Sequence, residues 1–159
     1  MTSAATQRPG LEAAVAGVSM GGLPTRIVVP AAGVDVAVSE VGVSVENGKA
    51  AYETAWRAAG HHLDSALPGQ LGNMVITGHV SVADSRNLAV FSRLDDVKAG
   101  DIVQVYSGDT AFRYQVSKVM VVPPSAVKLL RSDSTATVTL VTCTKDLKHR
   151  LVVVGTLTA

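Results

Sequence analysis

The sequence predicts an all-β domain, either a closed barrel or a sandwich. Two observations carry this prediction: short β-branched runs recur along the chain, and turn residues separate them. Helical signals are weak and short, and strands do not alternate with helices as they would in a parallel α/β fold. A chain of 159 residues is long enough for one domain with its own hydrophobic core.

Seven segments are strand candidates. One of them, Val34–Val38, alternates with period two, as a half-buried strand does. The turn Ser107-Gly108-Asp109 separates two others and predicts a hairpin. The seven candidates are Arg26–Val29, Val34–Val38, Met74–Thr77, Ile102–Tyr106, Phe112–Val122, Thr135–Thr142 and Leu151–Leu157.

The remaining segments are predicted to be connections. Asn87–Leu94 and Pro124–Leu130 have the spacing and start signals of one or two helical turns. Ala50–Ala59 has helical propensity but is bracketed by glycines, so helix and loop stay equally open. Glu40–Asn73 is the best candidate for one long connection, and long loops in compact domains are often functional.

Composition excludes several classes of function. The 14 basic and 13 acidic residues leave a net charge of +1, which favours neither nucleic acid nor a charged membrane surface as a partner. No apolar run is long enough to span a bilayer, and the first residues do not have a signal-peptide pattern. We expect residues 1–22 to form a flexible lead and 23–159 to form the domain.

The chain has a single cysteine, Cys143, which cannot form a disulfide within the chain. It is therefore either a small buried hydrophobic residue or a nucleophile. Cys143 follows the apolar run Thr139–Thr142 and precedes a polar stretch, so it is expected at the rim of a barrel. This position favours the nucleophile.

Two further residues have a suitable place. His79 follows the strand Met74–Thr77 through one glycine, and an imidazolium can donate a proton to a leaving amine. Arg150 begins the last strand, which would lie antiparallel to the Cys143 strand and bring the guanidinium near the thiol. There it could stabilise an oxyanion, although a surface histidine and a solvated arginine are the plainer alternatives.

No cofactor is predicted. The four histidines and Cys143 do not have the spacing of a zinc site, and the chain lacks a glycine-rich phosphate loop. Asp84, Asp95 and Asp96 lack the alternating pattern of a calcium loop, so calcium is unsupported by the sequence.

The chain resembles the sortases, the cysteine transpeptidases of bacterial cell surfaces, from about residue 23 to residue 157. The run Thr139-Leu140-Val141-Thr142-Cys143 fits the TLxTC signature of the family, and Arg150-Leu151-Val152-Val153 resembles its arginine strand. Upstream, Gly72-Asn73 and Gly78-His79 match the family's GNxxxxGH stretch. Weaker similarities lie in Arg26–Pro30, Gly33–Val36, Ser65–Gly69 and Val90–Leu94.

The resemblance implies a closed barrel of about eight strands with short helices in the connections. It implies Cys143 as the nucleophile on an LPXTG-like sorting signal, His79 as general acid and base, and Arg150 as the residue that positions substrate and stabilises the oxyanion. Thr142 would line the same site as a substrate-binding residue, either by contributing to the oxyanion hole or by contacting the peptide. The partners would be sorting-signal peptides and an amine of peptidoglycan or pilin, at the outer face of the cell membrane.

The chain departs from the family's pattern in two places. Sortases are usually tethered by an N-terminal membrane segment, which this sequence does not show. Either the full-length protein is anchored by a segment outside this chain, which is the expectation, or the chain is an atypical member of the family. The segment Tyr52–Asp64, with Trp56 and His61-His62, does not match one sortase class.

Two alternatives to a transpeptidase stay open: a non-catalytic peptide-binding barrel, and a cysteine hydrolase that uses water as the acceptor.

Overall fold

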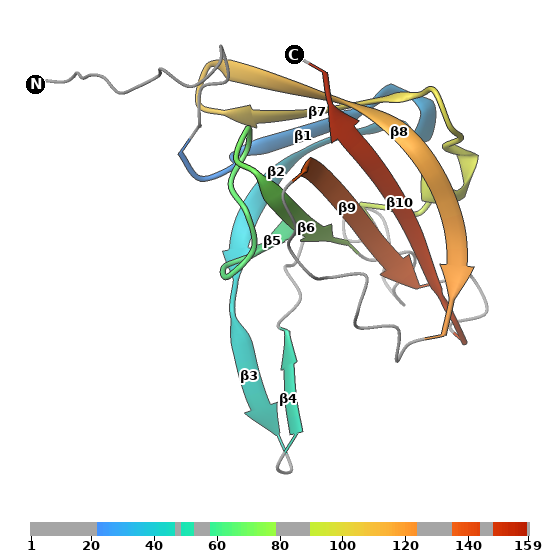
Figure 1. The fold of residues 1–159 in the computed structure, drawn as a ribbon. Coiled ribbons are helices and arrows are strands. Elements are labelled where there is room, and N and C mark those ends of the chain that lie inside the picture. The colour runs from blue at the N-terminus through green and yellow to red at the C-terminus, as the bar shows by residue number, and fades with distance from the viewer. Residues whose placement is uncertain are drawn as a thin grey trace, which may run out of the picture.

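The fold is a closed β-barrel (Figure 1). The structure, a computed structural model, describes residues 22–46, 49–52, 58–78, 90–123, 135–143 and 148–158. Eight strands close the barrel in the order β1-β2-β5-β6-β9-β10-β8-β7. These strands are β1 (Arg26–Val29), β2 (Val34–Val41), β5 (Ala59–His62), β6 (Gly72–Thr77), β7 (Ile102–Ser107), β8 (Thr110–Val122), β9 (Ala136–Cys143) and β10 (Arg150–Leu157). The prediction of an all-β barrel is confirmed.

Two pairs of barrel strands are parallel, and one of them leads to the candidate site at the ends of β6 and β9. β2 pairs with β5, and β6 pairs with β9, in parallel ladders. The other barrel pairs are antiparallel, including the predicted hairpin of β7 and β8. Parallel neighbours need a long crossover. The partners β6 and β9 are therefore far apart in the sequence.

The expected long connection Glu40–Asn73 is wrong as a single loop. It contains the hairpin of β3 (Val43–Glu46) and β4 (Lys49–Tyr52), which projects from the barrel in Figure 1, and the barrel strand β5. The alanine-rich β4 has weak strand propensity, and its pairing with β3 overrides that local preference. β5 reads Ala-Gly-His-His, without any of the β-branched residues by which the other strands were found.

Helical structure is scarce in the part of the chain that the structure describes. It consists of two three-residue 3₁₀ turns, η2 (Pro30–Ala32) and η3 (Leu94–Asp96). The expected helical segment Asn87–Leu94 is described only from Val90, where it forms a turn that leads into η3. Pro124–Leu130 lies outside the described residues. Ala50–Ala59 begins in β4 and ends in β5, so at its described ends it is strand and not helix.

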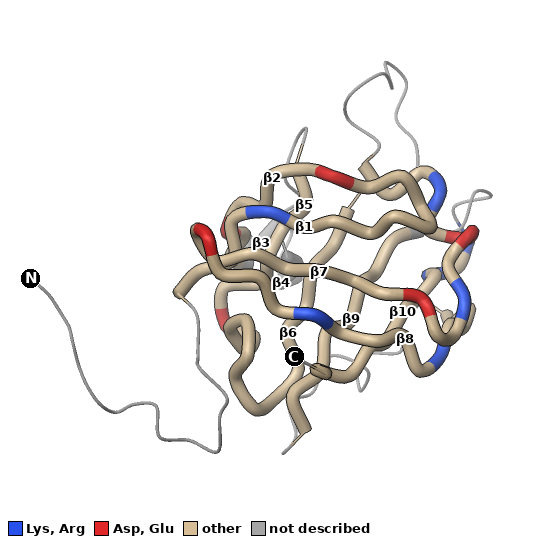
Figure 2. Tube along the Cα trace, turned by 90° about the horizontal axis from the view of Figure 1, so that it is seen from above, with Lys and Arg blue, Asp and Glu red and all other residues tan. Residues whose placement is uncertain are grey.

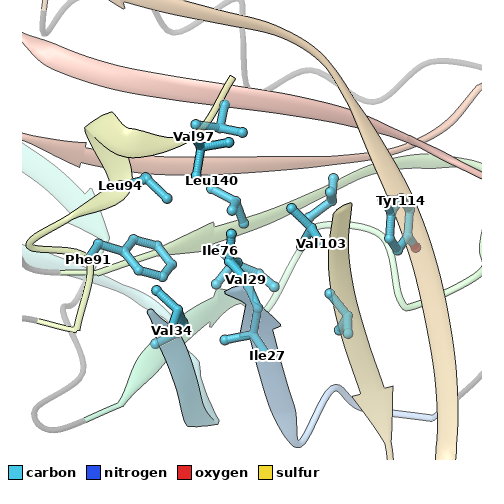
Figure 3. Packing of buried hydrophobic residues seen from close by; sticks show 14 of the residues in the cluster. Ile27, Val29, Val34, Ile76, Phe91, Leu94, Val97, Val103, Tyr114 and Leu140 are labelled. Carbon is cyan, nitrogen blue, oxygen red and sulfur yellow. The ribbon is translucent and has the colours of Figure 1, made fainter. Parts of the chain in front are cut away.

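Apolar side chains from every barrel strand fill the interior, as Figure 3 shows for part of the cluster. The segment before and within η3 adds Phe91 and Leu94, both fully buried, which lie beside barrel residues such as Ile76 and Leu140. Charged residues of both signs are spread around the described barrel (Figure 2). The connection that carries η3 thus closes the barrel core next to the end of β6.

The buried His62 of β5 predicts a loss of stability in mild acid. Burial lowers the pKa of His62 to about 4. The unfolded chain therefore takes up this proton first as the pH falls below the ordinary histidine value of about 6.5, and the free energy of unfolding decreases from there towards pH 4. Urea unfolding at about pH 7 and about pH 5 measures the loss. His62→Gln should reduce the difference between the two values, and an unchanged difference would contradict the assignment.

Candidate active site

Cys143 and Arg150 lie opposite one another. Cys143 is the last residue of β9, Arg150 is the first residue of β10, and the antiparallel register pairs them directly. Residues paired in this way have Cα atoms about 4.5–5.5 Å apart. The predicted antiparallel arrangement of the two strands is confirmed, and it brings the backbone of the cysteine next to the arginine.

Arg150 has a partly exposed side chain. Its Nη1 lies 3.5 Å from the carbonyl oxygen of His149, a long hydrogen bond on the neighbouring residue. No ion pair within the described ranges involves Arg150. A guanidinium that is partly exposed and not held by a described carboxylate can donate several hydrogen bonds to a carbonyl or an oxyanion.

Thr142 joins the ends of β6 and β9. Its side chain is buried, and its Oγ1 donates to the carbonyl oxygen of Gly78 at 2.7 Å. In the opposite direction, the backbone N–H of Gly78 donates to the carbonyl oxygen of Val141 at 3.2 Å. The residue after Thr142 is Cys143, and the residue after Gly78 is His79, which lies outside the described residues. The two bonds therefore connect the backbone positions that lead into both candidate catalytic residues.

Gly78 is required here by close packing. A Cβ atom at this position would lie 2.7 Å from Cδ2 of Phe91 and 2.8 Å from Cγ2 of Val90. Contacts this short do not occur in folded proteins, so any side chain would displace the segment before η3. The glycine of the Gly-His pair thus lets β6 end directly against the connection that closes the core.

A buried polar contact sets the register of β6 against β9, and sequence reasoning did not find it. Asn73 Oδ1 accepts hydrogen bonds from Thr139 Oγ1 at 2.6 Å and from Thr137 Oγ1 at 3.2 Å. Because the two strands are parallel, this contact at the start of β6 fixes how far Gly78 extends alongside Thr142. The alternating threonines of β9 and the asparagine of Gly72-Asn73 were a signal for it.

The described residues give no support for a metal site. They contain no group of three or more histidine, cysteine, aspartate or glutamate side chains that could hold an ion. In the same ranges, the structure has no helix with the length and apolar character of a membrane span.

The fold pairs the chain's single cysteine, at the end of one strand, with an arginine at the start of the next, an arrangement that can serve cysteine-dependent acyl transfer. The family model for the sortase domain matches residues 27–158. The chain therefore belongs to the sortase family, and it is a cysteine transpeptidase. Sortases act at the cell surface on sorting signals, with acceptors in the cell wall or in pilins.

Solved structures agree with the family and span several of its classes. The chain is similar to a sortase D5 transpeptidase of Clostridium perfringens, with 26% identity, a TM-score of 0.68 and coverage of 89% of this chain and 82% of that one. It is also similar to a lid mutant of sortase A from Corynebacterium diphtheriae (26% identity, TM-score 0.70, coverage 89% and 73%). A third similar structure is sortase C1 from Streptococcus agalactiae, with 26% identity, a TM-score of 0.69 and coverage of 85% of this chain and 67% of that one. Among curated proteins no sequence matches.

Proposed function

We propose that Cys143 cleaves an LPXTG-like sorting signal and transfers its acyl part to an amine of peptidoglycan or pilin. The Cys143 thiolate attacks the peptide carbonyl, and the bond to the leaving amine breaks after that nitrogen accepts a proton from the His79 imidazolium. The incoming amine then gives a proton to His79, attacks the thioester and releases the thiolate. The proton that His79 gives to the leaving amine in the first step is thus replaced by the proton of the incoming amine in the second step.

The observation that carries this proposal is the direct pairing of Cys143 with Arg150. A tetrahedral intermediate on Cys143 carries a negative oxygen, and a guanidinium one strand away can donate hydrogen bonds to it. The bond from Thr142 to Gly78 supports the assignment of His79, because it joins the residues that precede Cys143 and His79.

A product assay tests the proposal. Sorting-signal peptides that vary around LPXTG are incubated with the protein, with and without an amine acceptor, and mass spectrometry follows the peptide and the protein. We expect an acyl adduct on Cys143 and a new amide that depends on the amine. Free acid as the only product at every amine concentration would indicate a hydrolase, and saturable binding without an adduct would indicate a peptide-binding barrel.

Arg150 is expected to contribute strongly to the rate. Arg150→Ala should lower kcat/KM by about 10²–10³-fold, the range found when one oxyanion donor is removed. Arg150→Lys should recover part of the loss, because it keeps the charge but not the two-pronged geometry. The exposed Arg113 of β8 provides the matched control, and Arg113→Ala should keep the parental rate. Equal rates for the two alanine variants would contradict the role.

Thr142 is expected to act chiefly by holding Gly78. Thr142→Val leaves the Gly78 carbonyl without its donor and should cost about 1–3 kcal/mol of unfolding free energy together with a lower kcat. Thr142→Ser keeps the hydroxyl and should retain most of both. Urea unfolding and peptide kinetics provide the measurements. An increase in KM alone, with stability unchanged, would instead favour a direct contact between Thr142 and substrate.

A further inference from the structure

A histidine of β5 is buried with an acceptor at each ring nitrogen. His61 is fully buried, its Nδ1 lies 2.7 Å from Oε1 of Glu40, and its Nε2 lies 2.9 Å from the carbonyl oxygen of Ala66. A carbonyl oxygen and a carboxylate oxygen only accept hydrogen bonds, so the ring satisfies both when it donates from both nitrogens. That form is the imidazolium, whose charge the Glu40 carboxylate balances.

Ser65 extends this group but is not an activated nucleophile. Its Oγ lies 3.1 Å from Nε2 of His61, so the order of carboxylate, imidazole and hydroxyl is the one that serine hydrolases use. The Ser65 hydroxyl, however, donates to the carbonyl oxygen of His62 at 2.8 Å and accepts from the backbone N–H of Val75 at 3.0 Å. A hydroxyl whose proton is held by a carbonyl has no base to activate it. These contacts therefore hold backbone in place.

The backbone that they hold is that of β6. Ser65 binds the Val75 N–H, and the backbone N–H of Ala66 donates to the carbonyl oxygen of Asn73 at 3.1 Å. His61 itself is paired with Ile76 in the ladder between β5 and β6. One side of β6 is thus anchored to His61 and its loop, and the other side is anchored to β9.

We propose that Glu40, which is partly exposed, and the buried His61 form an ion pair that positions β6 for the transfer reaction, so that His61 and Glu40 are positioning residues. The two N–H groups of the protonated His61 ring hold Glu40 of β2 and Ala66 of the loop 63–71 at the same time. When one of these two protons leaves, one of the two acceptors loses its donor, and the Ser65 hydroxyl can turn from His62 towards the ring. The loop then shifts, and β6, which ends at Gly78 beside Thr142, shifts with it.

Few other titratable groups face this pair among the described residues. His62 follows on β5, and Asp64 lies in the loop. The Tyr114 hydroxyl of β8 accepts from the backbone N–H of Gly69 in the same loop, and burial raises the pKa of Tyr114. β6 contributes no titratable side chain. Of these groups, Glu40 is the one in direct contact with the His61 ring.

Nuclear magnetic resonance of the intact chain, with labelled histidine rings and backbone amides, tests the ion pair without any assay of catalysis. We expect both ring nitrogens of His61 to carry protons at about pH 7. In Glu40→Gln the amide oxygen can still accept but the charge is gone, so the ring should lose one proton and the amide signals of Val75 and Gly78 should move. A singly protonated His61 ring in the parent protein would overturn the ion pair.

Kinetics test the positioning role, which rests on the proposed function. Glu40→Gln should lower kcat by about 10-fold with little change in KM, because β6 is displaced while peptide contacts remain. Asp35→Asn removes an exposed carboxylate from the same strand, β2, and should leave both kcat and KM at the parental values. If Glu40→Gln moves neither kcat nor the Gly78 amide signal, the positioning role is wrong. Absence of any transfer by the parent protein would count against the proposed function alone, since the ring and amide signals still decide the inference.

Discussion

Cys143→Ala is expected to abolish transfer, with a fall in the rate of about 10³-fold or more and no acyl adduct on the protein. The reason is that the proposed reaction passes through a thioester, and alanine offers no atom to form it. Loss of a covalent nucleophile leaves only the smaller contributions of substrate binding and oxyanion stabilisation. Mass spectrometry of the intact protein after incubation with peptide measures the adduct, and product formation measures the rate.

Two controls separate chemistry from folding in this experiment. The circular dichroism spectrum and the urea midpoint of Cys143→Ala should match those of the parent protein within error. Cys143→Ser offers a weaker nucleophile at the same place and should also lose most of the activity. An adduct on the alanine variant, or cleavage at the parental rate, would show that the reactive group lies elsewhere in the chain.

Gly78→Ala is expected to disturb both stability and activity. The new methyl group would lie 2.7 Å from Phe91 and 2.8 Å from Val90, so either the end of β6 or the segment before η3 must move. Overpacking of this kind costs about 1–3 kcal/mol of unfolding free energy. Because Gly78 also carries the carbonyl that Thr142 binds, kcat should fall in the same variant. Urea unfolding and peptide kinetics give the two values.

A second glycine provides the matched control. A Cβ atom on Gly22 would come no closer than 3.4 Å to Oγ of Ser107, which is an ordinary contact, so Gly22→Ala should keep parental stability and activity. The backbone of Gly78 does not have the positive φ angles that only glycine adopts easily, so its effect is steric and not conformational. Parental stability in Gly78→Ala would mean that the segment at Val90 and Phe91 yields without cost.

Local sequence predicted those strands whose signal lies within the strand itself. The hairpin of β7 and β8 has β-branched residues on both sides of Ser107-Gly108-Asp109, and the structure pairs the two strands across that turn. β9 and β10 follow the same logic, because a short polar stretch joins two apolar runs. For this reason the position of Arg150 beside Cys143 could be predicted from the order of residues alone.

The strand β5 could not be predicted in this way. Its Ala-Gly-His-His run has no pattern of a strand, and it becomes one because β2 and β6 pair with it and Glu40 supplies a charge for His61. The contact of Asn73 with Thr139 and that of Gly78 with Thr142 join residues more than sixty positions apart. No local signal specifies which distant strand lies alongside β6.

The sequence by itself determined the all-β class, the family resemblance, and the pair formed by Cys143 and Arg150, since adjacent strands and short turns express local preferences. Only the tertiary structure decided the parallel pairing of β6 with β9 and the buried contacts on both sides of β6. The physical reason is that Asn73, His61 and Thr142 are buried and take hydrogen-bond partners that are remote in the chain. A buried polar group needs a hydrogen-bond partner, and here the folded structure supplies it from elsewhere in the chain.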